Sequence, residues 1–92
     1  MRRIDAYPVW PGYNKPIMRC GSIILSCGAY EGRDHGFVCA LGDDEVEALP
    51  MDIYVAMANK AMPDDVAVGV WVPCGSYDLN YMRYHVFWTI RR

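Results

Sequence analysis

The sequence predicts an α+β fold, a two-layer sandwich in which an antiparallel sheet of about four strands packs on one helix. Two segments, residues 22–41 and 66–92, alternate apolar and polar side chains around turn residues, which is typical of β-hairpins. Between them, apolar residues recur at helical spacing. A chain of 92 residues that is 53% hydrophobic is one small domain with a buried core. We therefore expect a ββαββ core over residues 21–92, preceded by an irregular arm over residues 1–20.

The N-terminal arm contains three prolines, Pro8, Pro11 and Pro16, within nine positions. Proline removes a backbone donor and favours extended geometry in the residue before it, so a long helix is excluded here. The arm is also rich in apolar side chains, including Tyr7 and Trp10. We expect a proline-rich extended arm or an irregular edge strand that packs on the body of the domain.

The first hairpin follows the arm. Its strands are predicted at Ser22–Tyr30 and Phe37–Leu41, and the polar residues 31–34 form the turn between them. Alternation places three side chains of the first strand on a common face: Ile23, Leu25 and Cys27. In the second strand it places three side chains on one side: Phe37, Cys39 and Leu41.

The single helix is predicted between the two hairpins. Asp44 and Glu47 resemble a capping box at a helix start, and an alternative start places Pro50 in the first helical turn. Pro63 ends the segment. The apolar stripe of this helix consists of Leu49, Ile53, Ala56 and Met57.

The closing hairpin pairs residues 66–74 with residues 81–92 across the turn Gly75–Asn80. Its core face is predicted to carry Val66, Val68, Val70, Val72, Cys74, Met82, Tyr84, Val86, Trp88 and Ile90. The opposite face is predicted to carry Ala67, Gly69, Trp71, Tyr81, Arg83, His85, Phe87, Thr89 and Arg91.

This opposite face is the candidate binding surface. A helix of about 12 residues is ~18 Å long and covers less than half of one face of a sheet roughly 19 Å wide. The second face is therefore left open, and aromatic and arginine side chains dominate protein interfaces. The candidate interface residues are Trp71, Tyr81, Arg83, His85 and Phe87.

The predicted function is that of a small, non-enzymatic interaction protein that acts through protein–protein contacts, including contacts with itself as a homodimer. An aromatic sheet face is also a stacking platform for single-stranded nucleic acid. The net charge of −2 and the absence of a basic cluster argue against nucleic acid. A second surface, the acidic patch, offers a negative charge to a basic partner or simply caps the predicted helix. It consists of Asp43, Asp44, Glu45 and Glu47.

The competing hypothesis is a small enzyme or metal-dependent module that uses the turn residues Asp34 and His35 with a cysteine. No second motif supplies the missing partners. The four cysteines lack a Cys-x-x-Cys pair and are expected to be reduced and mostly buried; they are Cys20, Cys27, Cys39 and Cys74. A Cys74–His85 dyad is disfavoured because the two residues lie on opposite faces of the predicted hairpin. We predict no catalytic residues, no metal and no cofactor.

The predicted location is the cytoplasm, and no membrane partner is expected. No apolar run approaches the roughly 20 residues that a membrane-spanning helix needs. The N-terminal residues lack the apolar core of a secretion signal.

Overall fold

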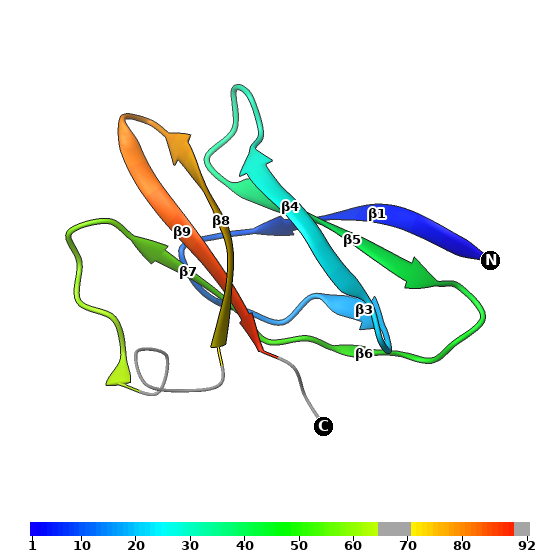
Figure 1. The fold of residues 1–92 in the computed structure, drawn as a ribbon. Helices are drawn as coiled ribbons and strands as arrows, with labels where there is room; N and C mark the ends of the chain where they lie inside the picture. Colours follow the sequence, from blue (N-terminus) through cyan, green and yellow to red (C-terminus); the bar gives the residue numbers. More distant parts are fainter. Residues whose placement is uncertain (65–70, 90–92) are drawn as a thin grey trace.

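The computed structural model describes residues 1–64 and 71–89, and every element that it defines there is a strand (Figure 1). The strands are β1 (Arg2–Val9), β2 (Gly12–Asn14), β3 (Ile17–Arg19), β4 (Ile23–Ala29), β5 (Gly36–Asp43), β6 (Ala48–Pro50), β7 (Ile53–Met57), β8 (Trp71–Leu79) and β9 (Met82–Thr89). They form three antiparallel sheets, with strand orders β1–β5–β4, β2–β7–β9–β8 and β3–β6. The predicted α+β sandwich is therefore wrong, because the architecture is all-β.

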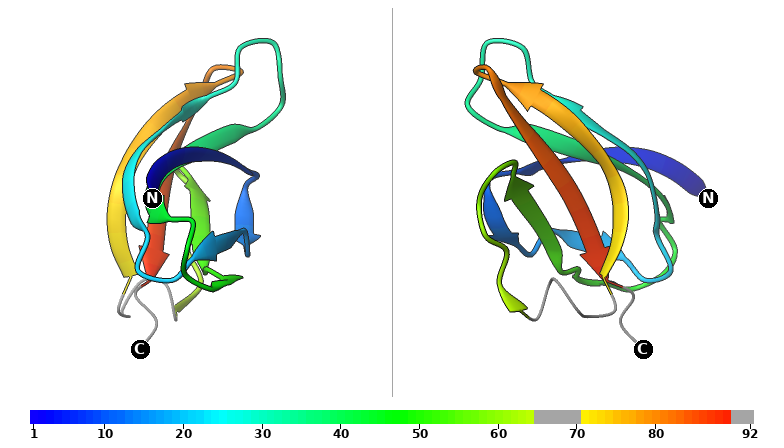
Figure 2. Two further views of the ribbon diagram at one scale, coloured as in Figure 1. Left: turned by 90° about the vertical axis from the view of Figure 1, so that its right-hand side faces the viewer. Right: turned by 60° about the vertical axis from the view of Figure 1, so that its left-hand side comes forward.

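The two larger sheets face each other across one core, and β4 runs beside β8 where the sheets meet (Figure 2). Alternate residues of β1 and β5 point inward against alternate residues of β7 and β9. The small β3–β6 sheet adds Met18, which is 1% exposed. The buried apolar residues are Val9, Met18, Val38, Ala40, Ile53, Val55, Ala56, Tyr77, Tyr84 and Val86.

The first hairpin is confirmed, since β4 and β5 pair antiparallel. A β-bulge between Ile24 and Ser26, however, reverses which alternate side chains of β4 point toward the core. Ile23 and Leu25 are 52% and 49% exposed, whereas Cys27 packs against the core. The predicted common face for these three residues fails because a bulge reverses the alternation along a strand.

The closing hairpin also forms, as β8 and β9, but its turn is shorter than predicted. Leu79 pairs with Met82, so only Asn80 and Tyr81 lie between the strands. Met82, Tyr84, Val86 and Trp88 do belong to the core or pack against it, although their partner is a second sheet. Val72 is exposed, and the predictions for Val66, Ala67, Val68, Gly69, Val70, Ile90 and Arg91 lie outside the described residues.

The predicted helix is replaced by a turn and the strands β6 and β7. Ile53 and Met57 are four residues apart, a spacing that fits the helical period and the strand period equally well. The β-branched Ile53 and Val55 favour the strand, and both are buried while Tyr54 points outward. The acidic start is a turn in which the backbone N–H of Glu45 donates to Oδ1 of Asp43 at 3.0 Å.

The N-terminal segment forms β1, β2 and β3 instead of an irregular arm. Pro8 lies on β1, an edge strand of its sheet, where a missing N–H is tolerated. Gly12 has a φ of +98°, which allows the tight turn from β1 into the second sheet. In residues 1–64 and 71–89 there is no helix long and apolar enough to cross a membrane.

Candidate functional site

The outward side of the β1–β5–β4 sheet, called here the outer face, is almost entirely apolar. The strand register places Ile4 beside Leu41, and Leu41 beside Ile23, in one row across the sheet. Ile4 and Ile23 are 62% and 52% exposed. The outer face consists of Ile4, Ala6, Pro8, Ile23, Leu25, Ser26, Gly28, Phe37, Cys39 and Leu41, with the charged pair Arg2 and Asp43 at one end. A contiguous apolar surface that a small domain leaves exposed often marks a site of interaction with another protein.

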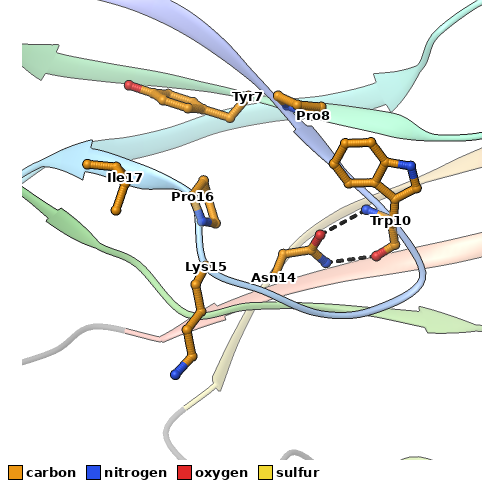
Figure 3. A pocket seen from close by; sticks show the side chains of 7 residues that line it. All are labelled: Tyr7, Pro8, Trp10, Asn14, Lys15, Pro16 and Ile17. Carbon is orange, nitrogen blue, oxygen red and sulfur yellow. Dashed lines mark hydrogen bonds between the residues drawn. The ribbon is translucent and has the colours of Figure 1, made fainter.

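A cleft of about 340 Å³ lies between β1 and the segment that leads into β3 (Figure 3). Its walls are two aromatic rings, two prolines and one aliphatic side chain, with a lysine at its margin. The lining residues are Tyr7, Pro8, Trp10, Asn14, Lys15, Pro16 and Ile17. The cleft is shallow and open to solvent, and its walls are mainly apolar.

Asn14 fixes the shape of this cleft. Its Oδ1 accepts a hydrogen bond from the backbone N–H of Trp10 at 2.9 Å, and its Nδ2 donates to the carbonyl of Trp10 at 2.7 Å (Figure 3). Nδ2 also donates to the carbonyl of Gly12 at 3.0 Å. One side chain thus closes the loop on which Trp10 is carried, so the indole is held in place before any ligand binds.

Behind Trp10 lies a row of aromatic rings. The indole stacks on His35 with ring centroids 4.6 Å apart, and Tyr30 meets His35 edge-on at 5.1 Å. Nδ1 of His35 lies 3.1 Å from Oδ1 of Asp34, and this hydrogen bond lowers the pKa of the Asp34 carboxyl. Asp34 and His35 are therefore in contact, and the imidazole of His35 stacks on Trp10, while an enzymatic or metal-binding role for the pair stays a prediction.

A second hollow, of about 270 Å³, adjoins this row. It is lined by Pro8, Tyr30, Arg33 and His35. Pro8 borders both hollows, and the Trp10–His35 stack lies between them. The two hollows therefore form one aromatic surface that runs along the end of β1.

Three of the predicted interface residues, Arg83, His85 and Phe87, alternate along β9 and point away from the core. Arg83 is bound by Asp78 across the hairpin through two hydrogen bonds of 2.9 and 2.8 Å. Trp71 lies near Tyr13, with ring centroids 6.5 Å apart. The structure thus brings these side chains to one side of the second sheet, where charged and aromatic groups are mixed.

Tyr81, the remaining predicted interface residue, stands apart at the tip of the β8–β9 turn. It is fully exposed. The φ angles of Asn80 and Tyr81 are +52° and +64°, the signature of a type I′ turn. The second position of such a turn favours glycine, so a tyrosine there is strained.

Replacing Tyr81 with glycine should therefore raise the free energy of unfolding by about 1 kcal/mol, because the strain is removed and no buried contact is lost. Urea denaturation followed by tryptophan fluorescence measures the change. Asn80→Gly is the matched control and should stay within about 0.5 kcal/mol, since asparagine tolerates this conformation. A loss of stability in Tyr81→Gly would show that the ring makes stabilising contacts.

The acidic patch lies in the turn between β5 and β6. Asp43 and Asp44 accept hydrogen bonds from the amino group of Met1 at 3.2 and 3.0 Å. The backbone N–H of Glu45, together with this amino group, lowers the pKa of Asp43. Glu47 contributes its carbonyl, which accepts the N–H of Cys20. These contacts give two of the acids a role in the turn, and binding to a basic partner stays a prediction.

The cysteines are free thiols, and the side chains of Cys27 and Cys74 lie within hydrogen-bonding distance of each other. Burial raises the pKa of Cys74 to about 12, and the neighbouring Cys27 adds to the shift. Burial also raises the pKa of Cys27. Protonated thiols are poor nucleophiles and poor metal ligands. Among the described residues, no group of three or more His, Cys, Asp or Glu side chains is placed to hold a metal.

No protein-family model, curated protein or solved structure matches this chain. The candidate surfaces therefore stand on geometry alone. Sequence reasoning missed both the outer face and the cleft. The alternation of Ile4, Ala6 and Pro8 was a signal for the outer face, but the pairing of β1 with β5 was needed to interpret it.

Proposed function

We propose that this protein is a small non-enzymatic interaction protein that acts through protein–protein contacts, and that it associates with a second copy of itself through the outer face. The observation that carries the proposal is the row Ile4–Leu41–Ile23, three large apolar side chains in register on an uncovered sheet. The proposed interface is still an open sheet face. It is now assigned to the β1–β5–β4 sheet and not to the closing hairpin.

Two faces compete for this role, and their composition separates them. The outward side of β9 carries Arg83 and His85, whose charge or polarity is costly to remove from water. The outer face is apolar apart from Ser26 and, at one end, the pair Arg2 and Asp43, whose opposite charges adjoin. Burial of apolar surface drives most protein association, which favours the outer face.

A second copy is a suitable partner because sheets pack well on sheets. Two such faces stack about 10 Å apart with their strands nearly aligned, as in β-sandwiches. At one end of the face Arg2 pairs in register with Asp43, so opposite charges adjoin and a two-fold contact buries no net charge there.

The size of the face sets the expected strength of the dimer. Three strands of about seven residues project roughly 330 Å², and two such faces with their side-chain relief bury on the order of 1,000 Å² of accessible surface. This value is at the lower limit for specific interfaces. We therefore expect a dissociation constant in the micromolar range.

Sedimentation velocity between about 5 and 500 µM tests the proposal. The wild-type protein should shift from monomer to dimer, and Ile4→Thr/Ile23→Thr should remain monomeric throughout. The matched control is Ile17→Thr/Leu49→Thr, which changes two other exposed apolar residues and should dimerise like wild type. A wild-type protein that stays monomeric over this range contradicts the proposal.

A second pair of substitutions distinguishes the two sheets. Trp71→Ala/Phe87→Ser alters the outward side of the other sheet and should leave the dimer intact. If this variant dissociates while Ile4→Thr/Ile23→Thr does not, the interface lies on the β2–β7–β9–β8 sheet and the outer face is not the contact surface.

A further inference from the structure

We propose that the cleft at Tyr7, Pro8, Trp10, Pro16 and Ile17 binds an extended, proline-containing peptide segment of another protein that carries acidic side chains. This site has a different partner from the dimer contact and shares only Pro8 with the outer face. The dimer contact is centred on the row Ile4–Leu41–Ile23, whereas the cleft lies at the far end of β1 and beyond it.

The walls of the cleft define what it binds. Tyr7 and Trp10 present aromatic surface, and Pro16 and Ile17 close the opposite side (Figure 3). Both the amide oxygen and the amide nitrogen of Asn14 are engaged by its own loop. The cleft therefore attracts its ligand through ring and proline packing, and grooves lined in this way bind polyproline II segments.

The cleft is also rigid before binding. Asn14 holds both polar groups of the Trp10 backbone, and His35 supports the indole from behind with Asp34 against its Nδ1. A preformed aromatic wall loses little conformational entropy on binding. A polyproline II segment is likewise ordered in the free state, so both partners keep the ordering cost low.

The two hollows suit an extended chain better than a compact ligand. They lie on either side of the Trp10–His35 stack and share Pro8. A polyproline II chain advances by about 3.1 Å per residue and places side chains in spaced positions. One such segment can therefore occupy the first hollow and continue past the stack into the second.

Charge complementarity selects an acidic ligand. Lys15 stands at one end of this surface and Arg33 at the other. Neither forms an ion pair within residues 1–64 and 71–89, but the exposed carboxylate of Asp34 lies beside Arg33, whose charge helps to lower the pKa of Asp34. The attraction for an acidic side chain of the ligand is therefore centred on Lys15, which fixes where that end of the chain lies.

The probe is a fluorescein-labelled decapeptide of proline with two glutamates, and binding is measured by fluorescence anisotropy with increasing protein. Two matched peptides replace either both glutamates with lysine or all prolines with alanine. We expect each matched peptide to bind at least about fivefold more weakly, because the first loses charge attraction and the second loses its preformed shape. Equal binding of all three peptides, or binding of none at 1 mM protein, overturns the proposal.

Variants locate the site. Trp10→Ala should weaken binding at least about tenfold, since aromatic anchors dominate interfaces. Lys15→Glu should weaken binding about fivefold because it reverses a charge that attracts the ligand. Tyr81→Ala, at an exposed tyrosine elsewhere, should bind like wild type. Circular dichroism checks that each variant is folded. If Trp10→Ala does not fold, Lys15→Glu still tests the site. Unchanged affinity in the folded variants places the binding elsewhere and overturns the proposal.

A labelled oligothymidylate serves as the competing probe, because stacked aromatic rings also bind single-stranded nucleic acid. We expect no displacement of the peptide by it, given a chain with a net charge of −2 and one basic residue at each end of the surface. Tighter, salt-sensitive binding of the oligonucleotide that is lost in Trp10→Ala would make this a nucleic-acid site and reject the peptide.

Discussion

Gly36→Ala should lower the free energy of unfolding by about 3 kcal/mol, at the upper end of the usual cost of overpacking a core. A Cβ at this position would lie 2.5 Å from Cζ of Tyr77 and 2.6 Å from the backbone oxygen of Gly28. Tyr77 is 6% exposed and stacks on Tyr84, so its ring has nowhere to move. Urea denaturation measures the loss of stability.

Gly28→Ala is the matched control for this experiment, because it lies in the same hairpin. Its Cβ would also meet a ring, at 2.8 Å from Cζ of Phe37. That ring lies on the outer face and can turn toward solvent, so we expect a cost of about 1 kcal/mol or less. If both variants lose the same stability, the packing of Tyr77 on Gly36 is not the cause.

Met18→Ala should be comparably destabilising, by about 3 kcal/mol. Met18 is among the largest fully buried side chains and comes from the small β3–β6 sheet. Its truncation leaves a cavity between the two larger sheets, whose strands are hydrogen-bonded and cannot collapse to fill it. Thermal or urea denaturation measures the change.

The neighbouring Ile17 provides the control for Met18. It lies on the same strand with the opposite facing and is 56% exposed. Ile17→Ala should cost less than about 1 kcal/mol, since it removes little buried surface. Equal losses in the two variants would mean that β3 contributes to stability through its backbone and not through Met18.

The strands of the two hairpins could be predicted from the sequence because period-two alternation is a local signal. Tyr84, Val86 and Trp88 were assigned to the core side and pack there. The helix could not be excluded in the same way. Ile53 and Met57 satisfy both periods, and the strand forms because β7 pairs with β2 and β9, which lie far away in the sequence.

The N-terminal strands could be predicted only as extended backbone, because prolines favour extended geometry but do not show which strand pairs with it. Pro8 sits on an edge strand and Pro11 in the crossing between sheets, where neither interrupts a ladder. The cleft was beyond sequence reasoning for a related cause. It depends on Trp10 meeting His35, 25 residues later, and on the local closure by Asn14.

The pairing of β1 with β5 has a consequence for how this chain acquires its structure. Arg2 lies opposite Asp43 and Gly12 opposite Val55, so each of these residues must wait for about forty further residues to be synthesised before its partner exists. Folds dominated by such distant pairings form in milliseconds to seconds. During that interval Ile4 and its neighbours on β1 lack a partner strand, which makes β1 a segment that needs protection from aggregation.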